Sequence, residues 1–397
     1  MDVSGADDDD AGSRKQPAQA VPDMVLSAGV PQRSTGPDPT MRERIAQLQK
    51  AISAVLGPEL DGVHSLALLD FPDHPNVGDS AIYLGEIAWL RRHHGIVPRY
   101  VCGTGNFCAE ALRQAVPEGP ILIHGGGNFG DIWPHHQRLR EAVLVAFPGR
   151  RVVQLPQTIH FDDSAEQERM AAAIAAHGNV LLLVRDQRSF DLVRAAFRCE
   201  VRLCPDMAFV LGPQAPRAPA RHGVLLLLRT DKERADAGLP PSVPAAAVID
   251  DWLEEPVNFR DWARRRSAVQ VALAAPARAF DRNYQRERLY RALARHRLAR
   301  GLHLLGGART VITDRLHGHI LCLLLGIPHI VFDNMYGKLG AVIDTWTADC
   351  GLVERAGSLA AALDRWNVAH RPSPASPPVR GSEVLPVWAG GGAAIPH

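Results

Sequence analysis

Short apolar runs and helical stretches alternate along the first half of the chain, with a period of roughly 30 residues. The apolar runs have the length and composition of buried strands, and polar residues follow them. They lie at residues 66–69, 121–124, 152–158, 180–184 and 201–203. Because parallel strands need a crossover connection that is usually a helix, this alternation predicts an α/β chain with a parallel, doubly wound sheet.

The alternation is interrupted at residues 212–220, which are rich in Pro and Ala and lack hydrophobic periodicity. The strand pattern restarts at 224–228, so we interpret the interruption as an interdomain linker. Residues 232–265 are charged and contain Pro240-Pro241, and we predict that they form a mobile insertion. The predicted organisation is a disordered tail at 1–40, a first domain at 41–212, a linker at 213–221, a second domain at 222–369 and a loose tail at 370–397.

Composition excludes several classes of protein. The 397 residues are 46% hydrophobic and 22% charged, which is typical of a globular protein with room for two cores. A net charge of +1 gives no general attraction to nucleic acid. No stretch reaches the roughly 18 apolar residues of a membrane span, and the acidic run at 7–10 is the opposite of a secretory signal. None of the six cysteines forms a C-x-x-C pair, so we expect reduced thiols, no metal site and a cytoplasmic location.

The stretch with the most chemical content is Thr313-Asp314-Arg315-Leu316-His317-Gly318, which lies between two apolar runs. The pattern predicts a strand, a tight turn and a helix, with Gly318 allowing close backbone approach. Arg315 and His317 cannot share one helix face, but both would point into the crevice at the carboxyl end of the strand, where open α/β sheets bind ligands. Arginine offers a planar fork for phosphate or carboxylate, and histidine offers a proton near neutral pH. The spacing alone agrees equally well with a structural role, in which Arg315 pairs with Asp314 and His317 caps the turn.

A polar loop at residues 71–80 follows the first predicted strand. Asp79 or Ser80 is predicted to cap the helical run at 81–90, which would leave backbone N–H groups facing an anion. A plain capped helix explains the same pattern.

A second loop, which begins Gly125-Gly126-Gly127, follows another predicted strand. It is neither a Walker A sequence nor a dinucleotide-binding fingerprint. Asn128, Asp131 and Trp133 add polar groups and an aromatic wall that would suit a sugar, although a tight crossover turn accounts for the glycines equally well.

Seven short segments in this order resemble the polysaccharide pyruvyl transferase family, and the resemblance extends over roughly residues 65–350. They are Asn76-Val77-Gly78-Asp79, the loop from Gly125-Gly126-Gly127-Asn128 to Asp131, Leu155-Pro156-Gln157-Thr158, Arg185-Asp186, Cys204-Pro205-Asp206, Arg229-Thr230-Asp231 and Asp314-Arg315-Leu316-His317-Gly318. Their order and spacing carry the resemblance, because each segment alone is a weak signal.

The resemblance implies two Rossmann-like doubly wound domains facing a cleft, as in glycosyltransferases of the B type. It implies transfer of a pyruvyl group from phosphoenolpyruvate to a sugar of a bacterial exopolysaccharide or cell-wall glycan precursor, commonly as a pyruvate ketal, with release of phosphate. His317 would be the general acid, with Arg315 as its catalytic partner. Donor binding would fall to Arg185, Arg315, Leu316, His317 and Gly318, and acceptor binding to Asn76, Asp79, Gly126, Gly127, Asn128 and Asp131.

The chemistry of the donor agrees with these residues. Phosphoenolpyruvate carries a phosphate and a carboxylate, and Arg185 and Arg315 would bind them from different domains. The phosphate would favour a protonated His317, whereas the helix N-terminus behind it opposes the positive charge. Asp79 and Asp131 are candidates for the base, and each is also a candidate cap or sugar ligand. Phosphoenolpyruvate is the donor substrate, and we expect no further cofactor or metal and no nucleic acid partner.

Two other functions stay open at this point. One is a nucleotide-sugar glycosyltransferase of the same architecture, and the other is a non-catalytic subunit of a polysaccharide assembly complex. The sequence leaves open which sugar is modified and whether the product is a ketal or an enolpyruvyl ether. It also leaves open whether the acceptor is lipid-linked, with the protein peripheral at the inner face of the membrane. Whether the protein is a homo-oligomer is open as well.

Overall fold

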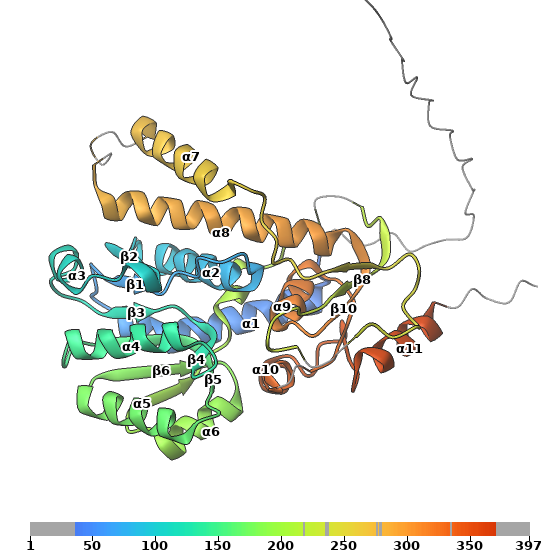
Figure 1. The fold of residues 1–397 in the computed structure, drawn as a ribbon, viewed down its shortest axis with the longest axis horizontal. Helices are drawn as coiled ribbons and strands as arrows, with labels where there is room; N and C mark the ends of the chain where they lie inside the picture. The colour runs from blue at the N-terminus through green and yellow to red at the C-terminus, as the bar shows by residue number, and fades with distance from the viewer. Residues whose placement is uncertain are drawn as a thin grey trace, which may run out of the picture. The chain divides into compact units, whose positions relative to one another are not determined.

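The computed structural model describes residues 36–216, 219–234, 238–274, 277, 280–333 and 336–370. Two parallel sheets dominate these residues (Figure 1). The first is seven-stranded within the described residues, with the order β2-β1-β3-β5-β6-β7 and β4 paired to β5. The second is five-stranded there, with the order β12-β11-β10-β8-β9.

The strands of the first sheet are β1 (Ala67–Leu69), β2 (Tyr100–Cys102), β3 (Ile121–Ile123), β4 (Gly126–Gly130), β5 (Val152–His160), β6 (Val180–Val184) and β7 (Glu200–Leu203). Those of the second are β8 (His222–Leu227), β9 (Val248–Asp250), β10 (Ala308–Thr313), β11 (His329–Val331) and β12 (Val353–Arg355). Every strand pairing in both sheets is parallel. The predicted parallel α/β architecture is therefore confirmed.

The helices that connect these strands are α1 (Pro39–Leu56), α2 (Val77–His94), α3 (Ala109–Ala115), α4 (Pro134–Ala146), α5 (Ser164–His177), α6 (Gln187–Ala196), α7 (Phe259–Ala274), α8 (Arg282–Gly306), α9 (Leu316–Leu325), α10 (Lys338–Trp346) and α11 (Leu359–Ala369), with a short 3-10 helix η3 at Met207–Leu211. None of the helices in the described part of the chain is long and apolar enough to span a membrane.

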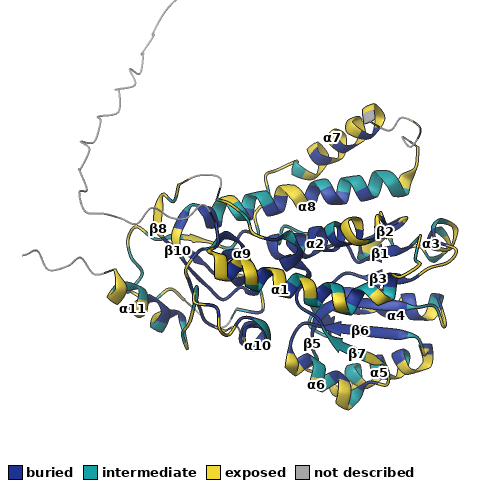
Figure 2. Ribbon diagram, turned by 180° about the vertical axis from the view of Figure 1, so that it is seen from behind, coloured by how far each residue is buried: buried dark blue, intermediate teal, exposed yellow. Residues whose placement is uncertain are grey.

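The central strands of each sheet are buried on both faces, which explains why strands such as β3 and β6 are apolar throughout. In β6, Leu181 and Leu183 pack in the cluster that includes α1 and α2, whereas Val180, Leu182 and Val184 pack with α3 to α6. The second sheet buries one face against α9 and the other against α11. The hydrophobic cluster behind α1 and α2 continues into the second sheet, so the described residues of both sheets share one core (Figure 2).

Several boundaries differ from the sequence prediction. The helix predicted from residue 81 begins at Val77, and its cap is Asn76 rather than Asp79 or Ser80, because the Asn76 side chain accepts from Gly78 N. The glycine loop after β3 is partly a strand, since β4 pairs with β5. In this segment, the backbone hydrogen bonds between β4 and β5 outweigh the preference of glycine for turns.

Residues 232–265, predicted to form a mobile insertion, contain regular secondary structure in their described part, and their mobility stays a prediction. The described residues of this stretch contain β9, which pairs with β8, and the first turns of α7. The predicted division into two domains with a linker at 213–221 stays a prediction. The tail at 1–40 lies almost entirely outside the described residues, apart from the start of α1, and so does nearly all of the tail at 370–397.

A buried histidine pair, His319 of α9 and His329 of β11, leads to a testable prediction about stability in acid. His329 donates from Nδ1 to the carbonyl of Ile327 (2.8 Å), so its Nε2 accepts from His319 Nδ1 (2.8 Å), and Thr347 donates to the far nitrogen of His319 (2.9 Å). Burial lowers the pKa of His329 to about 4 and the pKa of His319 well below its usual value. The folded state therefore keeps both rings neutral, while the unfolded state binds protons below about pH 6.5.

We expect His329 alone to cost about 2 kcal/mol of unfolding free energy between pH 7 and pH 5. Burial raises the pKa of Asp314 to about 6. Protonation of Asp314 therefore stabilises the folded state as the pH falls from 7 to 5, which opposes the effect of His329. The test is therefore a comparison of urea unfolding at the two pH values for the wild type and for His329→Gln. The variant should lose less stability on acidification, and an equal loss in both proteins would contradict the assignment.

Candidate active site

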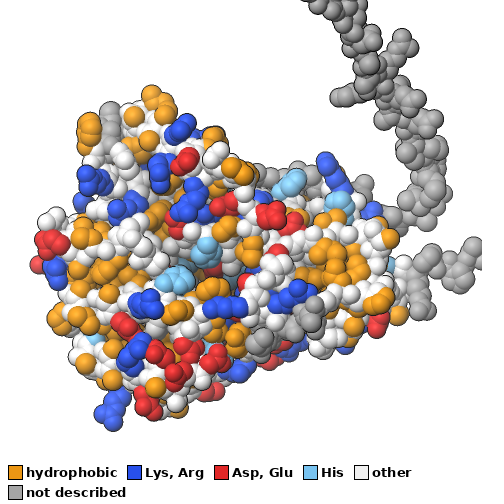
Figure 3. Space-filling view, in the orientation of Figure 1, with side chains coloured by type: hydrophobic (Ala, Val, Ile, Leu, Met, Phe, Trp, Pro, Cys, Tyr) orange, Lys and Arg blue, Asp and Glu red, His pale blue; other side chains and the backbone are white. Residues whose placement is uncertain are grey.

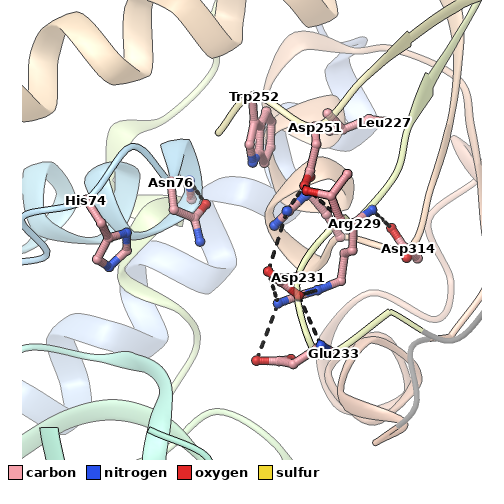
Figure 4. A network of polar contacts seen from close by, with 12 residues as sticks. His74, Asn76, Leu227, Arg229, Asp231, Glu233, Asp251, Trp252 and Asp314 are labelled. Carbon is pink, nitrogen blue, oxygen red and sulfur yellow. Dashed lines mark hydrogen bonds and ion pairs between the residues drawn. The ribbon is translucent and has the colours of Figure 1, made fainter. Parts of the chain in front are cut away.

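A cavity of about 400 Å³ lies where loops at the carboxyl ends of both sheets meet. Ligands bind at this edge in open α/β sheets. Its charged and aromatic lining is contributed by Arg185, Arg229, Arg315, Lys338, His74, His135, His136, His317, Asp79, Asp231, Glu233, Asp314, Trp133 and Trp252. In Figure 4, His74 and Asn76 at the start of α2 face the network of Arg229, Asp231 and Glu233 across this space.

The Thr313–Gly318 motif has the predicted strand–turn–helix form. β10 ends at Thr313, and α9 begins at Leu316 with Arg315 as its cap residue. The Thr313 hydroxyl donates to the carbonyl of Leu227 (2.7 Å) and accepts from Arg315 N (3.0 Å), which ties the turn to the end of β8. A Cβ at Gly318 would lie 2.7 Å from Thr313 Oγ1, so the helix can pack this closely only with glycine. Gly318 supports the turn and does not line the cavity.

Arg315 is buried and is held by carboxylates from the second sheet. Its guanidinium forms an ion pair and a hydrogen bond with Asp251, lies 3.7 Å from Asp231, and has its centre 5.9 Å from the Trp252 ring. Burial lowers the pKa of Arg315, and the two carboxylates act against this effect. The structural alternative that paired Arg315 with Asp314 is therefore wrong, because the ion-pair partners of Arg315 are Asp251 and Asp231.

His317 and Arg185 meet at one buried carboxylate. Asp206, which caps η3, lies 2.6 Å from Arg185 Nη1 and 3.4 Å from His317 Nε2. Burial alone would raise the pKa of Asp206, but His317 and Arg185 together hold it well below its usual value. Asp206 therefore stays ionised, and Thr158 accepts a second bond from Arg185 (2.9 Å). Nε2 of His317 is buried with no hydrogen-bond partner among the described residues.

The first turn of α2 packs in close contact with the His317 side chain. A Cβ at Gly78 would lie 2.4 Å from His317 Nδ1, so only glycine allows this approach. On the same turn, Asp79 accepts from the Asn76 side chain (2.8 Å) and lies 3.6 Å from His74 Nε2. Burial would raise the pKa of Asp79, but His74 and His317 lower it overall.

The glycine-rich segment contributes Gly127 and Asn128 to the lining. The Asn128 side-chain oxygen accepts from Arg140 and from Gln157 (2.8 Å), so its orientation is set from behind the cavity. Gly126 has a φ of +127° and sits beside Asp79, but it is not part of the lining.

Asp131 also lies outside the cavity lining. Its carboxylate accepts from the backbone N–H groups of Asp162 (2.8 Å) and Asp163 (2.7 Å), just before α5. This contact gives Asp131 a structural role at the end of β5.

Sequence reasoning assigned no role to several lining residues. Arg229 follows β8 as Arg315 follows the neighbouring β10, and it donates twice to Asp231 (2.9 Å each). Lys338 opens α10 and reaches Glu233 (3.2 Å) and the carbonyl of Gly127 (3.4 Å). The rule that identified Arg315, a cation directly after a parallel strand, would also have identified Arg229. No local signal marked Lys338.

Each cation in the cavity thus has a carboxylate near it. Arg315 Nη2 is ion-paired with Asp251, and His317 Nε2 lies 3.4 Å from Asp206. These carboxylates compensate the cost of burying the two groups. The described residues contain no group of three or more His, Cys, Asp or Glu side chains arranged to hold a metal ion.

Fold and cavity together define an α/β protein with a charged cavity at the carboxyl ends of its parallel strands. Residues 76–335 match the family model described as polysaccharide pyruvyl transferase. The chain is 33% identical over 335 residues to Pyruvyl transferase 1 of Schizosaccharomyces pombe, an alignment that covers 78% of this chain and 77% of the relative. It is 31% identical over 278 residues to EpsO of Bacillus subtilis, whose name assigns it provisionally to the pyruvyl transferases, with coverage of 70% and 84%.

A solved structure of a functionally uncharacterised protein from Klebsiella pneumoniae is also similar, with a TM-score of 0.53 and 17% identity. The match covers 78% of this chain and 99% of that one, and it shows a shared fold. The chain belongs to the polysaccharide pyruvyl transferase family.

Proposed function

We propose that this protein transfers the pyruvyl group of phosphoenolpyruvate to a sugar of an exopolysaccharide or cell-wall glycan precursor, forming a pyruvate ketal and releasing phosphate. The observation that carries the proposal is one cavity that brings the buried Arg185 and Arg315 together with His317. Arg229 and Lys338 belong to the same lining. A small ligand with a phosphate and a carboxylate would pair with these cations.

In the proposed complex, Arg185 and Arg315 bind the two negative groups of the donor from the two sheets. Their partners, Asp206 and Asp251, fix each guanidinium so that little side-chain entropy is lost on binding. Leu316 contributes an apolar contact beside them. Arg229 and Lys338 are additional cations within reach of the same ligand.

His317 then donates a proton to the methylene carbon of the donor, and C2 becomes cationic enough for a sugar hydroxyl to add. The first hydroxyl loses its proton to a base, phosphate departs from C2 and takes up a proton, and the second hydroxyl closes the ketal as it loses its own. Asp206 stays ionised and stabilises the protonated imidazole through a separation of 3.4 Å. The donor and the side chains supply the whole step, so it needs no additional cofactor.

We assign the acceptor to the side of the cavity formed by α2 and β4. Asp79 has a lowered pKa, so it is ionised at neutral pH and is our candidate for the base that receives the hydroxyl proton. Asn76 and Asn128 would orient the sugar, and Trp133 and Trp252 offer flat faces for it. Gly126 and Asp131 support this wall from outside the lining.

Two broader assignments belong to the same proposal. The two sheets would be the cores of two Rossmann-like domains that face the cavity, as in glycosyltransferases of the B type, with the donor on the side of the second sheet. The six cysteines are free, which suits a reducing cytoplasm.

The test is a phosphate-release assay with purified protein, phosphoenolpyruvate and a panel of free and lipid-linked oligosaccharides. We expect phosphate release that depends on the acceptor, and a product that carries the mass increment of a pyruvate ketal. Calorimetric titrations with phosphoenolpyruvate and with nucleotide sugars form the second arm. Binding of a nucleotide sugar with no affinity for phosphoenolpyruvate would overturn the proposal in favour of a glycosyltransferase, and donor binding without turnover on any acceptor would favour a non-catalytic subunit.

The contact between Gly78 and His317 gives a first prediction for this activity. Gly78→Ala would push the imidazole or the start of α2 aside, because the new Cβ would lie 2.4 Å from Nδ1. Displacing a catalytic group by about 1 Å typically costs about 100-fold in rate. We expect a loss of that size in phosphate release, with an unchanged circular dichroism spectrum.

The matched control is Gly57→Ala, since a Cβ at Gly57 meets nothing within 4 Å. Equal activity of both variants would show that His317 tolerates the displacement and would count against its role as the acid.

A further inference from the structure

Half of the large exposed hydrophobic side chains among the described residues lie in one short stretch around α7. They are Val257, Trp262, Val269, Leu273 and Phe280, with exposures that range from 43% for Trp262 to 96% for Phe280. A contiguous exposed apolar surface usually marks a site of interaction. We call these five side chains, together with the arginines of α7, the α7 surface.

The exposed residues of α7 form a stripe that faces away from the protein. Ala263, Ser267 and Val271 recur every four residues and are buried on the side that packs on α8. Trp262, Val269 and Leu273 recur with spacings of seven and four residues, which places them together on the other side of the helix. The inner face of α7 therefore holds the helix in place. In the outer stripe, Trp262 also contacts the His296 ring of α8 at 4.8 Å, whereas Val269 and Leu273 are more exposed.

Arginines lie beside the N-terminal half of the apolar stripe. The helix carries Arg260, Arg264, Arg265 and Arg266 against a single acidic residue, Asp261, although the net charge of the whole chain is only +1. Arg266 lies over the Trp262 ring at 5.3 Å. Figure 3 shows hydrophobic and basic side chains mixed over α7 and α8, at the upper left of the view.

A basic groove of about 330 Å³ separates α7 from α8. Its lining includes Arg260 and Arg264 of α7 and Arg282 and Arg286 of α8. Asp73, which is ion-paired with Arg260, also belongs to the lining. Arginine forks of this kind bind phosphate groups. An apolar stripe beside a phosphate-binding groove has the two components of a helix that lies in a membrane interface.

The α7 surface is connected to the candidate active site. Trp252 and Leu253 line the cavity, and the chain reaches α7 six residues after Leu253. Arg300 of α8 donates to the carbonyls of Trp252 (2.6 Å) and Pro75 (2.7 Å), both of which belong to lining residues. A surface bound to α7 and α8 would therefore lie close to the cavity wall.

We propose that the α7 surface docks this protein on an anionic lipid bilayer, with the apolar stripe in the interface and lipid phosphates in the arginine groove. Docking needs no turnover, so it goes beyond the proposed function and can fail or succeed independently of it. A membrane fits better than a protein partner because the apolar residues are dispersed among arginines rather than gathered in a flat apolar core.

The test is co-sedimentation of the full chain with vesicles of phosphatidylcholine, with and without phosphatidylglycerol. We expect binding to the vesicles that contain phosphatidylglycerol and release at high salt. Each arginine near an anionic surface strengthens binding about fivefold, so Arg265→Gln/Arg266→Gln should weaken it more than tenfold. Trp262→Ser/Leu273→Ser should weaken it by about tenfold or more through loss of apolar burial.

Matched controls are Val145→Ser/Val368→Ser, which removes exposed apolar side chains elsewhere, and Arg194→Gln/Arg198→Gln, which removes exposed positive charge near α6. Both controls should bind vesicles as the wild type does. Binding that ignores phosphatidylglycerol, or that survives both α7 variants, would overturn the proposal. A dimer in analytical ultracentrifugation that Trp262→Ser/Leu273→Ser abolishes would also overturn it, because the stripe would then be an interface between two copies of this chain.

Discussion

His317→Gln is expected to lower the rate of acceptor-dependent phosphate release by about 10²–10⁴-fold, while phosphoenolpyruvate still binds. Glutamine fills similar space above Gly78 and can donate a hydrogen bond to Asp206, but it has no proton to give to a carbon at neutral pH. Donor affinity should hold because the anionic groups are bound by arginines. Steady-state phosphate release and calorimetric titration of the donor measure the two effects separately.

His303→Gln is the matched control, since His303 is exposed on α8. It should leave both the turnover and the donor affinity at wild-type values. Turnover of His317→Gln within threefold of the wild type would remove His317 from the role of acid. A parallel loss of donor affinity would instead make it a binding residue.

Arg315→Ala should weaken the binding of phosphoenolpyruvate by about 10- to 100-fold. A hydrogen bond to a charged group contributes about 1.5–3 kcal/mol, and Arg315 is positioned to make such bonds from a buried site. The substitution also leaves Asp251 and Asp231 without their partner, so the folded state should become less stable as well. Affinity therefore has to be separated from folding.

A double variant makes this separation. In Arg315→Ala/Asp251→Asn the unpaired charge at residue 251 is removed along with the arginine, so the thermal midpoint should recover while donor affinity stays low. If the double variant also recovered wild-type donor affinity, the donor would not be bound by Arg315. The donor site would then lie nearer Arg185 and Lys338.

Part of the site follows from local pattern. The strand that ends at Thr313, the turn through Arg315 and the helix from Leu316 all agree with the periodicity of the sequence, because a short apolar run followed by a polar turn leaves the backbone few alternatives. The same rule found β6 with Arg185 directly after it. Local pattern failed at β4 and β9, where pairing with a neighbouring strand outweighed glycine content and high charge.

The Arg315-Leu316-His317 motif shows which properties follow from the local sequence and which follow from tertiary packing. The sequence by itself determined that this arginine and histidine stand at the end of a parallel strand, because strand periodicity and helix onset are set by neighbouring residues. Only the tertiary structure decided what they touch. Asp206, Asp251 and Gly78 reach the motif from other elements, across separations such as the 64 residues between Arg315 and Asp251. Such partners are chosen by how the sheets and helices pack, and no periodicity within a single segment records that choice.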